Sequence, residues 1–179
     1  MRPSFSDTGI VIRSVDSGEA DKYVSLITEN HGLQDFVARG ARRISSKKAP
    51  HLDLFNLVKF QSGRGEHPRF LEQVESITYY PGIKSNFAKV GLCLTIIEIL
   101  QNTLPIEVED REIFLSTKSF LDAVEKSASE KENNRLGRKF GLYLLRHLGY
   151  PLPKLPETAK LTTYFESIMS KKLIGPLIK

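Results

Sequence analysis

The chain has 179 residues, of which 40% are hydrophobic and 26% charged, so it suits one or two globular domains and excludes wholesale disorder. Its net charge of +5 favours an anionic partner without identifying one. Residues 1–9 lack the apolar core of a secretion signal, and residues 92–100 form too short an apolar run to span a membrane. A lone cysteine, Cys93, suits the reducing cytoplasm, where we expect the protein to lie.

Residues 1–80 predict one domain of five short strands. The expected strands are Gly9–Val15, Tyr23–Thr28, Leu33–Arg39, Leu52–Gln61 and Arg69–Thr78. Turn-forming stretches such as DSGEAD at 16–21 separate them. Apolar alternation is clearest in the fourth segment, at Leu52, Leu54, Val58 and Phe60. Because few helical patterns interrupt the strands, we predict a closed antiparallel barrel, with the five-stranded OB-fold as the most economical arrangement.

Residues 81–179 predict a helical domain, which makes the whole chain α+β. The change comes at YYPGIKSN, residues 79–86, after which apolar residues cover most sides of a helix at 90–100. Asp110 is placed to cap a second helix. The face that this helix would bury is Ile113, Thr117, Phe120, Leu121 and Val124.

Two further helices are expected after a polar loop at residues 127–134. The first would bury Leu136, Phe140, Leu144 and Leu148 and end at Gly149 and Pro151. The stretch PLPKLPET, residues 151–158, indicates a stiff linker, and a last amphipathic helix would bury Leu161, Phe165 and Ile168.

Five cations gather in the connection between the third and fourth expected strands, where no acidic residue lies between Asp35 and Asp53. They are Arg39, Arg42, Arg43, Lys47 and Lys48. Each could neutralise one phosphate of a nucleic acid, and five such contacts predict a log–log salt slope of about −3.5 on single strands and about −4.5 on duplexes. A loop whose charges are merely solvated is the alternative.

A second set of cations falls on one side of the third expected helix, opposite its apolar face. These are Arg135, Arg138, Lys139 and Arg146. They could follow a second phosphate backbone, although a charged helix face is commonly just solvated. Aromatic residues near basic groups could stack on bases or belong to the core. They are Tyr23, Phe36, Phe70, Tyr79 and Tyr80.

Catalytic and metal-binding patterns are weak in this sequence. The four histidines have no ligand-like spacing, and Cys93 lies among apolar residues, as a structural thiol does. The acidic cluster at residues 107–112 complements a helix start. A nuclease or nucleotidyl transferase would need clustered carboxylates for Mg²⁺, so we expect no enzyme activity, no catalytic residues, no metal and no cofactor.

Several stretches together resemble the RecO family of bacterial recombination mediators. They are TGIVIRSVDSGEADKYVSLITENHG at 8–32, ARGARR at 38–43, GRGE at 63–66 and LLRHLGYPLP at 144–153. The resemblance implies an N-terminal OB domain followed by a helical domain. It assigns DNA binding to Arg42 and Arg43, to Arg39 beside them, and to Arg64 in GRGE, whereas Lys47 and Lys48 rest on charge alone.

The resemblance also implies a function: binding single- and double-stranded DNA, annealing complementary strands, and helping to load recombinase onto strands coated with single-strand-binding protein, with RecR as partner. A nucleoid-associated cytoplasmic location would follow. Many family members carry a four-cysteine zinc module after the LGYPLP-like stretch, whereas residues 154–179 contain no cysteine, so we expect no zinc site here. The alternative function is an adaptor whose helical domain captures an acidic, apolar partner tail.

Overall fold

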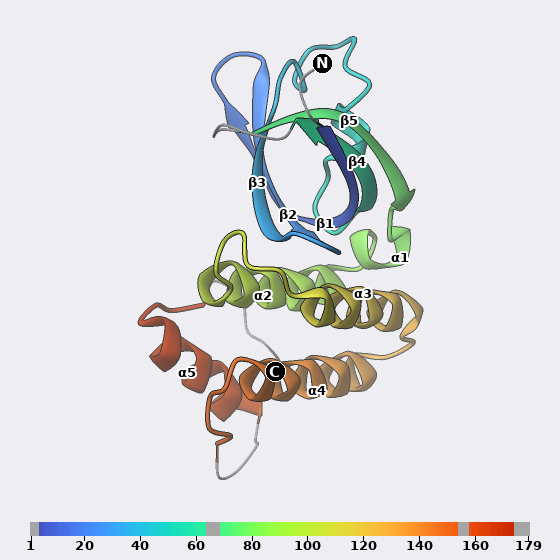
Figure 1. The fold of residues 1–179 in the computed structure, drawn as a ribbon. Helices are drawn as coiled ribbons and strands as arrows, with labels where there is room; N and C mark the ends of the chain where they lie inside the picture. The colour runs from blue at the N-terminus through green and yellow to red at the C-terminus, as the bar shows by residue number, and fades with distance from the viewer. Residues whose placement is uncertain (1–3, 64–68, 154–157, 174–179) are drawn as a thin grey trace. The chain divides into compact units, whose positions relative to one another are not determined.

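The computed structural model describes residues 4–63, 69–153 and 158–173 (Figure 1). The chain forms two compact units. The first comprises residues 1–79 and 105–118, and the second comprises residues 80–104 and 119–179. Residues 105–118, which the sequence analysis assigned to the helical domain, therefore fold with the N-terminal strands.

The first unit contains a closed five-stranded barrel (Figure 1). Its strands are β1 (Ser4–Ser17), β2 (Asp21–Thr28), β3 (Gly32–Ala38), β4 (Leu57–Gly63) and β5 (Arg69–Thr78). Around the barrel the order is β1-β2-β3-β5-β4, with β4 pairing back onto β1 and β3 running parallel to β5. This is an OB-fold arrangement, which confirms the predicted α+β fold class.

Alternating side chains fill the barrel. Val24 and Leu26 of β2 point inward together with Val58 and Phe60 of β4, as the period of two along a strand requires. Phe36 of β3 packs edge-to-face on Phe60, with ring centroids 5.2 Å apart. These inward-pointing side chains form the hydrophobic core of the barrel.

The fourth strand begins five residues later than the sequence predicted. Residues Ala49–His51 form a short 3₁₀ helix with Pro50 in its first turn. Phe55 has a left-handed φ of 73°, so an extended strand cannot run through it. Leu52 still reaches the barrel core, but it does so from the connection between β3 and β4. All four residues of the predicted apolar alternation contribute to the barrel core, but only Val58 and Phe60 belong to β4.

The segment at 105–110 is fixed to the start of β3. Ile106 forms an isolated parallel bridge with Leu33, and the Glu107 amide donates a hydrogen bond to the Leu33 carbonyl at 2.9 Å. The Glu107 carboxylate also lies 3.1 Å from the Arg69 guanidinium at the start of β5. These contacts explain why the segment belongs to the first unit.

Five helices follow the barrel strands among the described residues. They are α1 (Pro81–Lys84), α2 (Phe87–Thr103), α3 (Arg111–Lys126), α4 (Glu130–His147) and α5 (Thr158–Met169). Residues 92–100 of α2 are buried apart from Leu94, in agreement with the predicted burial on most sides of the helix. Asp110 accepts a hydrogen bond from the Ile113 amide at 3.0 Å, which confirms it as the cap of α3, and all five residues predicted for the inner face of α3 are buried.

Helix α4 begins inside the segment predicted to be a polar loop. Ser129 caps the helix by accepting a hydrogen bond from the Glu132 amide at 3.2 Å, and the Glu132 carboxylate accepts one from the Ala128 amide at 3.0 Å. This Ser-x-x-Glu pattern is a capping box that the sequence analysis overlooked. The predicted end is confirmed, since α4 stops at His147 and Gly149 has φ of 78°. In α5, Leu161 and Phe165 are buried, as predicted.

None of the described helices is both long and apolar enough to cross a lipid bilayer.

Candidate nucleic-acid interface

The basic loop, defined here as residues 39–48, leaves the end of β3 at one rim of the barrel. Gly40 turns the chain with φ of 67°, and its amide donates a hydrogen bond to the Asp21 carboxylate at 2.8 Å. Ala41 then enters the barrel core and is fully buried. The loop therefore starts with a buried anchor, beyond which its cations extend into solvent.

Arg42 fastens this loop to the turn between β1 and β2. Its backbone amide donates to the Ala20 carbonyl at 2.9 Å, and its guanidinium donates to the Gly18 carbonyl at 2.6 Å. The guanidinium also lies 3.2 Å from the Asp16 carboxylate. Because the Arg42 and Asp16 side chains are 35% and 58% exposed, water screens this ion pair and its stabilisation is about 0–1 kcal/mol. A phosphate could replace the carboxylate.

Lys48 closes the other end of the basic loop. Its ammonium donates to the Leu71 carbonyl at 2.8 Å and to the Arg39 carbonyl at 3.4 Å. Burial lowers the pKa of Lys48 below its usual value, against smaller opposing effects of Glu72 and Asp21. Lys48 thus has a structural role in holding the loop to β5, and its charge is turned toward the fold.

The Arg39 guanidinium lies over an aromatic ring at the base of the loop. Its guanidinium carbon is 3.7 Å from the centroid of Phe70, within the range of a cation–π contact. Arg39 remains exposed on the other side. An exposed guanidinium plane can both bind a phosphate and stack on a nucleobase.

Arg43 and Lys47 are the two cations of the basic loop whose side chains have no ion-pair, hydrogen-bond or aromatic-ring partner among the residues that the structure describes. Both side chains are exposed. The Cδ atom of Arg43 passes over Gly40, where a Cβ would lie 3.6 Å from it. These two side chains are the ones most available to an external anion.

The five predicted cations of the loop thus have three different surroundings. Arg42 and Lys48 fix the loop at its two ends, and Arg39 covers Phe70 at its base. Arg43 and Lys47 face solvent. Arg64, the sixth predicted residue, lies outside the described residues.

The predicted aromatic residues divide in a similar way. Phe36 and Tyr80 are buried, whereas Phe70 is half-buried beneath Arg39. Tyr23 lies on the outer surface of β2 with the Arg13 guanidinium 5.2 Å from its ring centroid. Burial and a hydrogen bond to Asp35 raise the pKa of Tyr23 to about 12. Sequence reasoning missed Arg13, because its place beside Tyr23 follows only from the register of β1 on β2.

The second predicted set of cations lies on the solvent side of α4. Arg135, Arg138, Lys139 and Arg146 are all exposed, as the helical period required. A surface depression of about 530 Å³ lies at the start of this helix. Its lining is Ser129, Lys131, Glu132, Asn134, Arg135 and Arg138.

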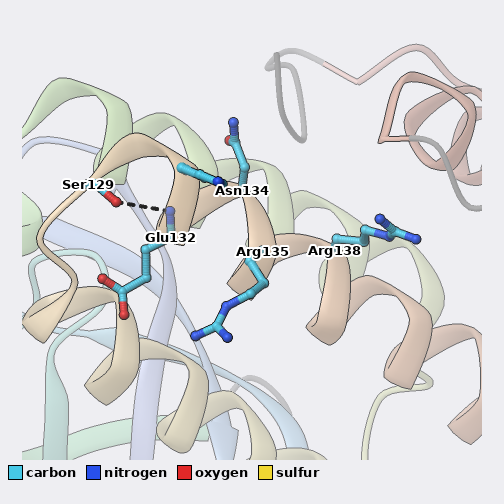
Figure 2. A pocket seen from close by; sticks show the side chains of 6 residues that line it. Ser129, Glu132, Asn134, Arg135 and Arg138 are labelled. Atoms are coloured by element: carbon cyan, nitrogen blue, oxygen red, sulfur yellow. Dashed lines mark hydrogen bonds between the residues drawn. The ribbon is translucent and has the colours of Figure 1, made fainter.

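The side chains at this depression do not converge on one point. Figure 2 shows Arg135 and Glu132 extending from the same side of α4, whereas Arg138 extends away from them. A carboxylate beside Arg135 reduces the local positive potential. The basic loop is therefore the stronger candidate for binding a polyanion.

Metal binding and cysteine reactivity have little support in the positions of the side chains within the described part of the chain. Over residues 4–63, 69–153 and 158–173, no group of three or more His, Cys, Asp or Glu side chains is placed to hold a metal ion. Cys93 is fully buried in α2, and its burial raises the pKa of the thiol to about 12. Cys93 is thus a structural thiol.

The family model and the similar proteins found by comparison all point to the same protein family. Residues 1–80 match the family model described as recombination protein O N terminal. The chain is 30% identical over 156 residues to the DNA repair protein RecO of Rubrobacter xylanophilus, covering 87% of this chain and 61% of that protein. It is 33% identical over 108 residues to the protein of the same name from Cutibacterium acnes, covering 60% of this chain and 44% of the relative.

A third relative, the DNA repair protein RecO of Clostridium acetobutylicum, is 28% identical over 148 residues, which are 83% of this chain and 59% of the relative. The chain thus spans roughly half the length of these curated relatives. The N-terminal match covers the barrel and the basic loop, and the longer matches extend through the helices. The chain belongs to the RecO family.

Proposed function

We propose that this chain acts in DNA repair and recombination by binding DNA through the basic loop. The observation that carries the proposal is the position of the loop: Arg42 fastens it to the β1–β2 turn at a rim of an OB barrel. In OB-folds, the loop between the first two strands is one of those that bind oligonucleotides. Arg43 and Lys47 extend from the fastened loop into solvent, where they can reach successive phosphates.

Charge neutralisation supplies a mechanism for annealing. Two DNA strands repel one another through their phosphates, and a cationic surface that holds one backbone lowers the cost of approach for the second. The exposed cations of α4 offer a further contact with DNA. No covalent step is needed, so the activity is one of binding and strand annealing, with double- as well as single-stranded DNA as ligand.

The partners that we propose follow from the family. The relatives are named as DNA repair proteins, and we propose that this chain likewise helps to load recombinase onto strands coated with single-strand-binding protein, together with RecR. The site of action would be the bacterial cytoplasm, at the nucleoid.

A strand-annealing assay tests this function. Two complementary oligonucleotides carry a donor and an acceptor fluorophore, and energy transfer reports their pairing, with bare strands and with strands coated by single-strand-binding protein. Replacing both Arg43 and Lys47 by Ala should slow annealing by roughly tenfold, the low end of electrostatic rate enhancement. Lys59→Ala removes one exposed charge from β4 and should leave the rate nearly unchanged. Equal rates for all three proteins would contradict the proposal.

An adaptor function is the alternative, and one feature of the second unit favours it. Phe87 and Leu94 of α2 are 94% and 41% exposed, and their spacing of seven residues places them on one side of the helix. An acidic, apolar tail of a partner protein could bind there. Capture of single-strand-binding protein that survives the Arg43 and Lys47 replacements but is lost on Phe87→Ala would support this alternative.

A further inference from the structure

Ile44 is a fully exposed apolar residue at the tip of the basic loop. Its exposed fraction is 108% of the reference value, the largest among the exposed apolar side chains described. The Ser46 amide donates to the Arg43 carbonyl at 2.9 Å, so Ile44 and Ser45 are the central residues of a β-turn. Central turn positions favour Gly, Pro, Asn, Asp and Ser. Neither turn formation nor burial in the fold accounts for an isoleucine here.

The loop holds Ile44 away from the barrel. On one side, Ala41 is buried in the core and Arg42 is bonded to the β1–β2 turn. On the other side, the Lys48 ammonium is bonded to the Leu71 carbonyl of β5. Folding Ile44 back onto the barrel would require these contacts to break. The Ile44 side chain is therefore exposed between the two anchors of the loop, where a partner can reach it.

The neighbours of Ile44 indicate what that partner is. Arg43 and Lys47, both exposed, flank it in the sequence. A DNA strand offers the complementary arrangement, because its phosphates are anionic and the faces of its bases are apolar. Isoleucine is among the side chains that DNA-binding proteins insert between bases, partially unstacking them. An anionic membrane would instead need a broad apolar face, and residues 45–48 are Ser and Lys.

We propose that Ile44 inserts between adjacent bases of a strand whose phosphates are bound by Arg43 and Lys47. The basic loop then disrupts base stacking in addition to attracting the backbone. This inference rests on the proposed function, since it requires that the loop binds DNA. Unstacked bases are free to pair with a second strand, which is what annealing requires.

The test compares two single-stranded ligands of equal length and charge. One carries normal bases, and the other has abasic sites at its central positions, so that the phosphates are kept and the bases are lost. Binding of the full chain is followed by fluorescence anisotropy. The variants are Ile44→Ala and, as a matched control, Ile77→Ala, which truncates another exposed isoleucine in the same unit.

The wild-type chain should bind the normal strand more tightly than the abasic strand, and Ile44→Ala should reduce that preference by about fivefold, the effect of one or two methyl groups losing contact with a base. Ile44→Ala should keep the salt dependence of binding, because it removes no charge. Ile77→Ala should behave as wild type.

Three outcomes would overturn the inference. If Ile44→Ala keeps the wild-type preference for normal bases while binding stays salt-dependent, Ile44 does not insert between bases, although the proposed function stands. If the wild-type chain binds neither strand, the proposed function itself fails. If Ile44→Ala loses binding to phosphatidylserine vesicles but keeps its DNA preference, the residue contacts a membrane instead.

Discussion

Gly32 shows how one residue determines the position of a whole segment. It has φ of 68°, and a Cβ added there would lie 1.9 Å from the Val108 carbonyl oxygen. The next residue, Leu33, accepts the hydrogen bond from the Glu107 amide. Only glycine permits this approach of residues 106–109 to the start of β3, because any side chain would meet backbone atoms that cannot move aside without a large cost in free energy.

Replacing Gly32 by Ala should therefore destabilise the fold strongly, by about 3 kcal/mol or more, because backbone strain and a steric clash add together. Gly18→Ala is the matched control, since Gly18 has φ of 59° but nothing within 4 Å of the added Cβ. Gly18→Ala should lower the free energy of unfolding by only about 1–2 kcal/mol, the strain of a left-handed backbone at a residue with a Cβ. The free energy of unfolding from urea titrations compares the two, and equal losses would contradict the packing described for residues 106–109.

The cations of the basic loop show what the sequence predicts at this scale and what it leaves open. The closeness of Arg42, Arg43 and Lys47 in the sequence was enough to predict a local concentration of positive charge, without knowledge of any tertiary contact. The sequence could not show that Arg42 bonds to the β1–β2 turn, because that contact joins residues 24 positions apart. Lys48 is the clearest case: it is identical in charge to Lys47, yet its ammonium is bonded to the Leu71 carbonyl.

At the scale of the elements, buried helix α2 supplies a built-in probe. Cys93 is the only cysteine of the chain and is fully buried. Burial raises the pKa of its thiol from 9.0 to about 12, an effect that Lys89 opposes only in part. A raised pKa means that less of the thiol is ionised to the reactive thiolate at pH 8 than in an exposed cysteine.

Native protein at pH 8 should therefore react with iodoacetamide far more slowly than protein unfolded in urea, in which the thiol recovers its ordinary pKa and becomes accessible. The labelling rate in native buffer then reports the opening of α2. Mass spectrometry measures the rate, and the single cysteine makes the assignment unambiguous. Equal rates in the native and unfolded states would show that α2 is not buried as described.

Elements with a strong period were predicted well, and those with mixed patterns were not. The buried faces of α3 and α5 followed from helical spacing alone. The start of β4 was predicted too early, because Leu52 is an apolar residue that packs in the barrel core from a loop and not from a strand. The start of α4 was missed, since polar composition at 127–134 outweighed the capping box of Ser129 and Glu132.

At the scale of the whole molecule, both the charge distribution and the fold indicate that the basic loop is where an anionic partner would bind. The net charge of +5 is modest, and over the first 80 residues acidic and basic groups nearly balance. The barrel concentrates its available cations by holding one loop at a rim. The OB-fold could be predicted because five short strands admit few closed arrangements, whereas the inclusion of residues 105–118 in the first unit depends on long-range contacts.

The central claim is that the basic loop binds the DNA backbone, and the salt dependence of binding tests it most directly. With Lys48 bonded to the fold, the four remaining cations predict a log–log slope of about −2.8 on an unstructured single strand. Replacing Arg43 and Lys47 by Ala should flatten the slope by about 1.4, whereas Lys59→Ala, on β4, should leave it as in wild type. A slope that the double replacement leaves unchanged would exclude this loop as the DNA-binding site.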